Sequence, residues 1–471
     1  MDKNFFLSNI LKKSIALLRV EEMRRAEGLA LAEGTSSERL MSAAGEAVFR
    51  EILSRWSLRQ VTVLCGPGNN GGDGFVVAQL LAAAGWPVRL GLWGDRAQLT
   101  AEAACQAQLW TGPIEPLLPQ LVTGAELIVD AVFGTRLSRP LDAALKEALT
   151  RLRQSARMVI AADVPSGVET DSGTDLGAMA ADVTVALAAF KPAHLLQPSA
   201  SRCGHILVAD IGIDATSARQ VIARPKLAPP TAADHKYTRG LVTVLSGEMN
   251  GAARLVATAA ARSGAGYVVL AGDTDAADTP LSIVHRSVET ALSDARMSAL
   301  VLGPGLGRSG DAEAMLHRLL LSNVSLVLDA DALRMAQPSQ IKRRQSPTIL
   351  TPHGGEFEAL FGPLSGSKID QALTAAEASG ATVLFKGADT VIASPDGRVG
   401  IAGHSSPWLS TAGTGDVIAG IAAAMLGRGI DAHDAACAAV WLHNRAAHLA
   451  GPALIADDLC THLPEALAAT L

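Results

Sequence analysis

The chain has 471 residues, of which 49% are hydrophobic, 18% charged and 4% aromatic, and its net charge is −6. A chain of this length is too long to form a single hydrophobic core, so two domains are expected. The Gly-rich aliphatic composition is typical of soluble α/β proteins. The small negative charge argues against general nucleic-acid binding.

The cysteines and the first residues favour a cytoplasmic protein. The five cysteines are far apart and form no CxxC pair, which argues against disulfides and a zinc site. Residues 1–18 are apolar but are interrupted by Lys12 and Lys13 and lack a small-residue cleavage pattern, which predicts an N-terminal helix rather than a signal peptide. No apolar run reaches about 18 residues, so we expect no membrane span.

The first half alternates short buried strands with helices. Continuous apolar runs bounded by Gly and Pro predict strands at Val61–Cys65, Val88–Trp93, Leu127–Phe133, Met158–Asp163, Val183–Leu187 and Ile206–Val208. Helices are predicted between them, for example at Phe75–Gly85 and Leu141–Arg153. Runs of this kind indicate a parallel sheet covered on both faces, so we predict a Rossmann-like doubly wound domain over residues 1–222.

A Pro-rich segment separates this domain from a second α/β region. Residues Arg224–Thr231 lack periodicity, and we predict a linker over 223–236 and a second domain over 237–471. Strands are predicted in it at Leu241–Leu245, Tyr267–Leu270, Ala299–Leu302, Ser325–Leu328, Thr348–Leu350 and Thr382–Phe385. No internal repeat relates the two halves.

Polar side chains follow several strands of the first half. Asn69 and Asn70 come after the first strand, Asp130 after the run Leu127–Val129, and Asp163 and Ser166 after Met158–Ala162. Because the carboxyl ends of parallel strands open onto one crevice, these groups are expected to converge there. Amide, carboxylate and hydroxyl oxygens suit a hard cation, and a remaining carboxylate would be free for proton transfer. Each Asp taken alone could instead cap a helix.

These segments resemble the NAD(P)H-hydrate epimerase domain. The resemblance covers roughly residues 15–215 and is carried by Asn69–Gly74, Asp130–Thr135, Leu137–Pro140, Asp163–Gly167 and Phe190–Pro192. It implies substrate contacts at Asn69, Asn70, Gly71, Gly72, Asp73, Gly134, Thr135, Arg136, Leu137, Ser138, Arg139, Pro140 and Asp163. It further implies K⁺ ligands at Asn70, Asp130 and Ser166, with Asp163 as the catalytic acid/base.

The sequence differs from that family at two places, which leaves a second hypothesis for the function of the first domain. Arg136 stands where the family usually has Gly, and Met41–Gly45 reads Met-Ser-Ala-Ala-Gly instead of Met-Glu-Asn-Ala-Gly. These changes leave open a binding or scaffold module without catalysis. Lys191 could serve the site or merely close a strand, and we leave it outside the catalytic set.

The second half contains a Gly-rich turn with an acidic residue. Thr411–Asp416 leads into the apolar run Val417–Met425, so backbone N–H groups of a helix start can hold an anion. Asp416 would repel a bound phosphate unless it takes a proton from a hydroxyl group during phosphoryl transfer. A simple acidic residue in a first helical turn is the alternative. Four further polar segments follow predicted strands: Gly303–Gly307, Asp329–Leu333, Thr351–Glu356 and Lys386–Thr390.

This second group of segments is similar to the ADP- or ATP-dependent NAD(P)H-hydrate dehydratase domain, which has the ribokinase-like fold. The resemblance runs from about Leu241 to the C-terminus. It implies hydrate contacts at Ala252, Gly305, His353 and Asp416, with a shift from Ala252 to Ala253 possible. It also implies nucleotide contacts at Lys386, Gly387, Ala388, Asp389, Thr390 and Gly415, catalysis by Asp416, and Mg²⁺ bound with ADP or ATP.

Together the two resemblances imply a bifunctional repair enzyme. The first domain would interconvert the R and S hydrates of NADH and NADPH, and the second would dehydrate the S form by phosphorylation and elimination. The alternative hypothesis is that the second domain is a small-molecule kinase, because such kinases also have Gly-x-Gly-Asp at a helix start. We expect a cytoplasmic homo-oligomer with no nucleic-acid or membrane partner.

Overall fold

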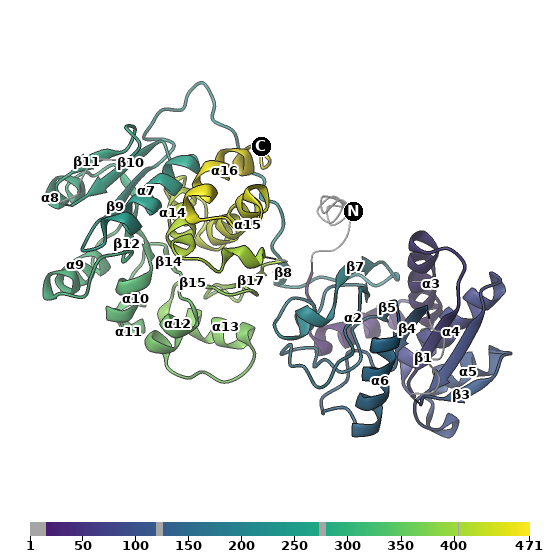
Figure 1. The fold of residues 1–471 in the computed structure, drawn as a ribbon. Coiled ribbons are helices and arrows are strands. Elements are labelled where there is room, and N and C mark those ends of the chain that lie inside the picture. The colour runs from purple at the N-terminus through teal and green to yellow at the C-terminus, as the bar shows by residue number, and fades with distance from the viewer. Residues whose placement is uncertain (1–15, 119–125, 273–278, 404) are drawn as a thin grey trace. The chain divides into compact units, whose positions relative to one another are not determined.

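The computed structural model describes residues 16–118, 126–272, 279–403 and 405–471 (Figure 1). The chain divides into two compact units, Met1–Gln220 and Val221–Leu471. None of the helices in the described ranges has the length and hydropathy needed to cross a membrane. The helix expected at residues 1–18 falls outside these ranges except at its end, where Ala16 and Leu17 instead form isolated β-bridges with Gln220 and Phe190.

The first unit is built on one parallel sheet. In the described part of the chain, its seven strands lie in the order β3 (Ile114–Pro116), β2 (Val88–Leu92), β1 (Val61–Cys65), β4 (Leu127–Ala131), β5 (Met158–Ala162), β6 (Val183–Leu187) and β7 (His205–Ala209). Every neighbouring pair is parallel. The predicted doubly wound sheet is confirmed. The edge strand β3 escaped prediction because it contains a single aliphatic residue.

Helices cover both faces of this sheet. They are α2 (Val20–Ala32), α3 (Ser37–Arg55), α4 (Asn69–Ala83), α5 (Ala101–Leu109) and α6 (Ala143–Ser155), with 3₁₀ turns at Arg96–Gln98, Pro192–His194 and Ser199–Arg202. Side chains of β1 alternate between the faces, so Val61 and Val63 join the core beneath α3 and α4 while Leu64 joins the core beneath α6. Burial on both sides explains why the strand has a continuous apolar sequence.

The strand order reverses at β1, and this reversal positions the first site. From β1 the chain passes through α4 to β2 on one side, whereas β4 lies on the other side of β1. The two connections therefore diverge and leave a crevice at the carboxyl ends of β1 and β4.

Helix α4 begins at Asn69, whereas the sequence predicted a loop followed by a helix from Phe75. Glycine in a helix costs about 1 kcal/mol relative to alanine, which made this segment look non-helical. Close packing against β1 explains the glycines. A Cβ atom on Gly71 would lie 1.9 Å from the Gly66 carbonyl oxygen, and one on Gly74 would lie 2.8 Å from Cys65 Sγ.

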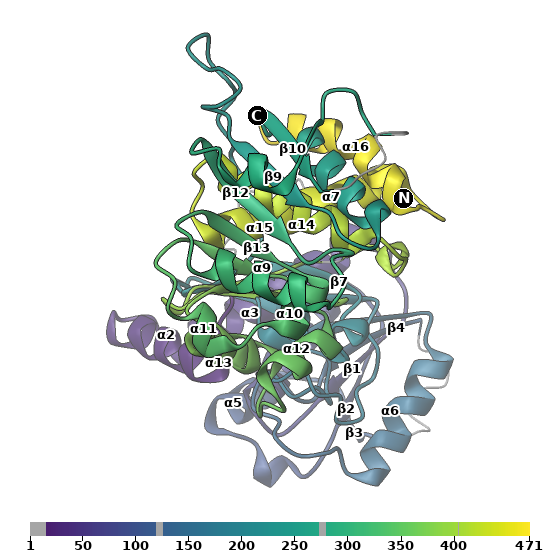
Figure 2. The same ribbon diagram turned by 90° about the vertical axis from the view of Figure 1, so that its left-hand side faces the viewer.

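The second unit contains a larger, mixed sheet (Figure 2). Within the described residues the order of the ten strands in this sheet is β11 (Val284–Arg286), β10 (Tyr267–Ala271), β9 (Leu241–Leu245), β12 (Met297–Leu302), β13 (Ser325–Leu328), β14 (Thr348–Leu350), β15 (Thr382–Phe385), β16 (Val391–Ala393), β17 (Val399–Ile401) and β8 (Arg219–Val221). The last of these, β8, spans the boundary at which the chain divides into units. The strands from β11 to β15 are parallel, and the β15–β16 and β16–β17 pairs are antiparallel. All strands predicted for this half are present, and the additional ones are too short to form a recognisable apolar run.

Helices complete the layers of the second unit. They are α7 (Asn250–Arg262), α8 (Val288–Leu292), α9 (Gly310–Leu320), α10 (Ala330–Met335), α11 (Pro338–Ile341), α12 (Gly354–Phe361), α13 (Lys368–Ser379), α14 (Thr414–Gly427), α15 (Ala432–Ala450) and α16 (Ala456–Ala468), with a 3₁₀ turn at Pro407–Leu409. The main core joins α7, α14, α15 and α16 to one face of the sheet. Residues 223–236, predicted as a linker, form no helix or strand, and the Leu227 N–H donates to the Thr470 carbonyl oxygen at 3.1 Å.

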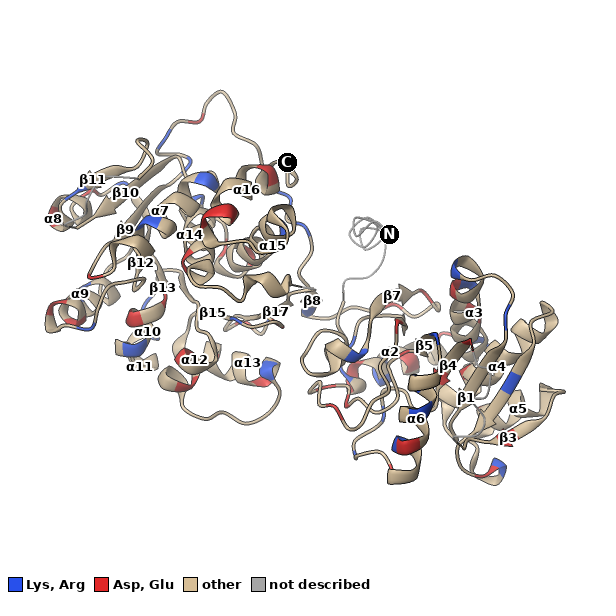
Figure 3. Cartoon of the chain, in the orientation of Figure 1, with Lys and Arg blue, Asp and Glu red and all other residues tan. Residues whose placement is uncertain are grey.

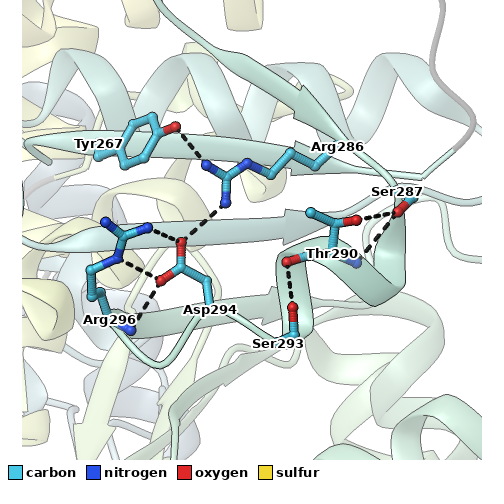
Figure 4. A network of polar contacts seen from close by, with 7 residues as sticks. All are labelled: Tyr267, Arg286, Ser287, Thr290, Ser293, Asp294 and Arg296. Carbon is cyan, nitrogen blue, oxygen red and sulfur yellow. Dashed lines mark hydrogen bonds and ion pairs between the residues drawn. The ribbon is translucent and has the colours of Figure 1, made fainter.

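Charged residues of both signs are interspersed along the elements of each unit (Figure 3). At the β10–β11 edge they form a defined network around Asp294 (Figure 4). Asp294 accepts hydrogen bonds from Arg296 at 2.8 Å and from Arg286 at 3.0 Å, and Arg286 also donates to the Tyr267 hydroxyl at 3.0 Å. The hydrogen bonds from Arg296 and Arg286 hold the pKa of Asp294 below its usual range. This network fastens the turn before β12 to the sheet edge.

From the packing of α3 on α4 we predict how two glycine substitutions change the free energy of unfolding. Gly45→Ala should lower the free energy of unfolding of the first unit by about 1–3 kcal/mol, as overpacked substitutions do, because its Cβ would lie 2.5 Å from the Val76 side chain. Gly28→Ala is the matched control, since nothing lies within 4 Å of that helical position, and it should raise stability by about 0.5–1 kcal/mol. Calorimetric unfolding measures both, and equal shifts for the two variants would contradict this packing.

Candidate active sites

A cavity of about 540 Å³ lies at the carboxyl ends of β1, β4 and β5 in the first unit. The predicted substrate residues that line it are Asn69, Asn70, Asp73, Gly134, Thr135, Arg136, Leu137, Ser138, Arg139 and Asp163. Met23 and Glu27 of α2 also line it. Sequence reasoning missed these two because no motif marks α2.

Three residues predicted to contact substrate are not among those that line the cavity. Gly71 and Gly72 are buried in α4, where Gly71 faces the Gly66 carbonyl oxygen and a Cβ on Gly72 would lie 2.5 Å from Met41 Sδ. The structure gives these two glycines a packing role in α4, and their predicted contact with substrate stays a prediction. Pro140 is exposed and lies just beyond the lining residues of its loop.

Asp163 is held in an unusual conformation at the end of β5. Its φ of +66° lies in the left-handed region, which costs about 1–3 kcal/mol for a residue other than glycine. His194 stabilises this backbone. The Lys191 N–H donates to His194 Nδ1 at 2.9 Å, so the proton of this ring is on Nε2, which donates to the Asp163 carbonyl oxygen at 2.8 Å. Burial lowers the pKa of His194 to about 4, which keeps the ring neutral.

A buried lysine faces the carboxylate of Asp163. Lys191 is fully buried, and its ammonium group donates to Asp163 Oδ1 and, at 2.6 Å, to the Leu187 carbonyl oxygen. The Leu187 N–H donates to the same carboxylate at 3.1 Å. The structure therefore assigns Lys191, which the sequence left undecided, to the support of Asp163.

Asp130 and Ser166 form a compact polar group beside the cavity. Asp130 is fully buried and accepts the Ser166 hydroxyl at 2.5 Å and the Ser166 N–H at 2.9 Å. Burial raises the pKa of Asp130, opposed by these hydrogen bonds. In the described parts of the chain no lysine or arginine forms an ion pair with it. Asn70 Nδ2 is buried without a hydrogen-bond partner, so its amide is available to a bound group.

In the second unit, Lys386, which follows β15, lies between acidic residues that follow β13 and β14. Its Nζ is 2.9 Å from Asp329 Oδ1, at the end of β13, and 3.8 Å from Glu356 Oε2 on α12. A Cβ atom added to Gly415 would lie 3.3 Å from the same Nζ, so the ammonium group faces the start of α14. The sequence-predicted residues Lys386 and Gly415 are thereby brought together.

The start of α14 contains the predicted acid/base residue Asp416. Gly413 caps this helix with a φ of +85°, and the buried ring of His443 contacts the Thr414 carbonyl oxygen at 3.0 Å. Burial, together with the negative charge of Asp329, raises the pKa of Asp416 to about 6, while Lys386 opposes the shift. A carboxylate with this pKa is suited to act as a general base near neutral pH.

Residues 387–390 form the predicted nucleotide-binding turn after β15. Gly387 and Ala388 are exposed, whereas Asp389 and Thr390 are buried. The Gly387 N–H donates to Thr390 Oγ1 at 3.2 Å. Lys368, at the start of α13, donates to Asp389 at 2.6 Å and lies against Gly387. No sequence motif marked Lys368, because it is distant from this turn along the chain.

The remaining predicted hydrate contacts lie at the starts of α12 and α7 and in the loop after β12. His353 caps α12, and its Nε2 lies 3.3 Å from Glu356 Oε1, which connects it to Lys386. Gly305 has a φ of +62° and accepts the Met249 N–H at 2.9 Å, and Ala252 donates to the Met249 carbonyl oxygen at 3.2 Å. Gly305 and Ala252 therefore contact the same residue, at the start of α7.

Comparison with known proteins assigns the two halves of the chain. Residues 242–468 match the family model described as NAD(P)H-hydrate dehydratase, and residues 37–193 match that of the YjeF-related protein N-terminus. A structure of the ADP/ATP-dependent NAD(P)H-hydrate dehydratase from Bacillus subtilis, co-crystallised with ATP/Mg²⁺, is 29% identical and covers 52% of this chain and 95% of its own, with a TM-score of 0.47.

Relatives that span both halves are also similar. The bifunctional NAD(P)H-hydrate repair enzyme Nnr of Coxiella burnetii is 34% identical over 484 residues, which covers 95% of this chain and 98% of that protein. The enzyme of the same name from Mycobacterium leprae is 33% identical and covers 96% of this chain and 98% of its own. With similarity of this extent along nearly its whole length, the chain belongs to the family of bifunctional NAD(P)H-hydrate repair enzymes.

Proposed function

We propose that residues 1–222 interconvert the R and S hydrates of NADH and NADPH, and that residues 237–471 dehydrate the S form at the expense of ADP or ATP. Residues 223–236 link the two. The observation that carries this proposal is that one chain contains both family segments, each with a carboxylate at the carboxyl edge of its parallel strands, Asp163 and Asp416.

In the first domain, Asp163 moves the proton of the hydroxyl group on the carbon that is inverted. The 540 Å³ cavity is large enough for the hydrated nicotinamide part of the substrate. Asn69 and the loop Gly134–Arg139 hold that part against Asp163, and Arg136 and Arg139 supply positive charge for the substrate phosphates. The Lys191 ammonium group keeps the carboxylate oriented.

The group formed by Asn70, Asp130 and Ser166 fits potassium. Among the described residues the fully buried Asp130 carboxylate has no lysine or arginine partner, which favours a bound cation. Carboxylate, hydroxyl and amide oxygens, which Asp130, Ser166 and Asn70 provide, are ligands that suit a hard cation. These three residues would hold the ion, which would supply a fixed positive charge beside the substrate.

In the second domain, phosphoryl transfer precedes elimination. The N–H groups at the start of α14 and the Lys386 ammonium group hold the transferring phosphoryl, while Asp416 takes the proton of the substrate hydroxyl. The hydroxyl oxygen forms a bond to phosphorus and the nucleotide leaves. Phosphate then departs with the C6–O electron pair, and loss of a proton from C5 restores the C5–C6 double bond.

The turn Gly387–Thr390 and Lys368 bind the nucleotide, and Ala252, Gly305 and His353 bind the hydrate. Mg²⁺ bound with the nucleotide would neutralise its phosphates, and Asp329 and Glu356 supply carboxylate oxygens of the kind that this ion takes. We further propose that the protein works in the cytoplasm as a homo-oligomer.

Single substitutions should separate the two activities. Asp163→Asn should slow epimerisation by about 10²-fold or more and spare dehydration, and Asp416→Asn should do the reverse, as for the loss of general acid–base groups. Chiral chromatography of R-hydrate and recovery of reduced-nicotinamide absorbance with ADP or ATP measure the two reactions. A phosphorylated product without released phosphate would identify a kinase instead, and an unchanged R-hydrate in the wild type would identify a binding module.

The raised pKa of Asp416 predicts how the rate of dehydration depends on pH under acidic conditions. Because the general base must be ionised, kcat/KM should level off above about pH 7 and approach a tenfold fall per pH unit below the pKa of about 6. The measurement is the initial rate of dehydration between pH 5 and pH 8 at saturating nucleotide. A rate that rose on acidification would exclude Asp416 as the base.

Potassium should stabilise the first domain through Asp130. Removing K⁺ should lower both its melting temperature and the rate of epimerisation, since the buried carboxylate loses its counter-charge. Asp130→Asn should abolish the response of the melting temperature to K⁺. Differential scanning calorimetry with and without K⁺ tests this, and a full response in the variant would show that the ion binds elsewhere.

A further inference from the structure

The cavity of the first unit contains a second carboxyl group in a different environment from Asp163. Asp73, in the second turn of α4, lines the same cavity and is only 8% exposed. Among the described residues no group donates a hydrogen bond or forms an ion pair to its carboxyl group. It is therefore a buried, unpartnered polar side chain that faces the space where substrate binds.

The fold places the two carboxyl groups in different electrostatic environments. Asp163 faces the buried Lys191 ammonium group and one further donor, the Leu187 N–H, which suits a carboxylate. Asp73 faces no cation at hydrogen-bond distance, and burial, with the negative charges of Asp163 and Glu27, raises its pKa well above its usual range. Two carboxyl groups of one cavity in such different environments suit the roles of a base and an acid.

The other charged groups around Asp73 support this difference. Glu27 from α2, Glu102 from α5 and Asp163 after β5 line the same cavity, and among the described residues that line it Arg136 and Arg139 carry positive charge. Cys65 of β1 is held neutral because burial and Asp73 raise its pKa. Asp130 of β4 accepts a hydrogen bond from the Ser166 hydroxyl group. Glu27 has its own opposing cation, since Arg136 counteracts the rise in its pKa that burial produces.

We propose that Asp73, in its protonated form, is the catalytic acid that works opposite the base Asp163 in the epimerisation. This assignment rests on the proposed function of the first domain. Asp163 takes the proton of the C6 hydroxyl as the C6–O bond becomes a carbonyl. The C6–N1 bond breaks, its electron pair goes to N1, and the Asp73 carboxyl group gives N1 its proton.

Rotation about C5–C6 then presents the other face of the carbonyl, and the same steps run in reverse. N1 attacks C6, its proton returns to Asp73, and Asp163 returns the proton to oxygen. The cycle needs no oxidant or co-reactant, and both carboxyl groups end as they began.

The test is the pH profile of R-hydrate epimerisation in the full-length enzyme. Because the acid must be protonated, the wild-type rate should fall at alkaline pH as Asp73 ionises. Asp73→Asn should lower kcat by about 10²-fold or more with a smaller change in KM, and should lose the alkaline limb. Glu27→Gln is the matched control in the same cavity: it should lose less activity and keep that limb. Dehydration by the second domain reports protein quality in each variant.

If Asp73→Asn folds poorly, infrared spectroscopy of the wild type tests the proposal without a measurement of activity. The wild type should show the infrared carbonyl band of a protonated carboxylic acid at neutral pH, and this band should titrate over the same range as the alkaline limb. An enzyme that epimerises the hydrate without an alkaline limb, or an Asp73→Asn variant that retains it, would overturn the assignment while leaving the proposed function intact. No epimerisation by the wild type would instead overturn the proposed function.

Discussion

A lysine ammonium group held against a carboxylate at the end of a parallel strand is the interaction on which both sites depend. In the first unit Lys191 faces Asp163, and in the second Lys386 faces Asp329 at 2.9 Å. Burying two charges is unfavourable, and removing either partner leaves the other uncompensated at a cost of about 3–5 kcal/mol. Each pair therefore fixes its neighbours strongly: the left-handed backbone of Asp163 in one case, the approach of α14 in the other.

The two units use this pair in opposite ways. In the first, the carboxylate of the pair is the group to which the proposed function gives the reaction, and the lysine orients it. In the second, the proposed function gives the lysine the phosphates, while burial and Asp329 raise the pKa of the nearby Asp416 to about 6. Under this proposal, the same ion pair serves an inversion that needs a fixed base and a transfer that needs a fixed cation.

Close backbone approach is the second constraint, and it explains most of the glycines in the motifs. Gly71 lies against the Gly66 carbonyl, and a Cβ on Gly303 would lie 1.8 Å from the Asp329 carbonyl oxygen. These contacts bring a helix or loop directly onto the strand ends where the charged groups converge. The network around Asp294 at the far edge of the second sheet has no such role and secures the sheet itself.

The sequence alone determined the α/β class, most strands of both sheets and the motifs at their carboxyl ends, because apolar runs and Gly-rich turns are local patterns. It also marked Asp163, Lys386 and Asp416. Only the tertiary structure decided that α4 begins at Asn69 with Gly71 and Gly72 closely packed, and that Lys191 and Lys368 lie against Asp163 and Asp389. The difference between Asp73 and Asp163 was likewise invisible in the sequence. Burial and counter-charge arise between segments far apart in the chain, and no local pattern encodes which of two aspartates will meet a lysine.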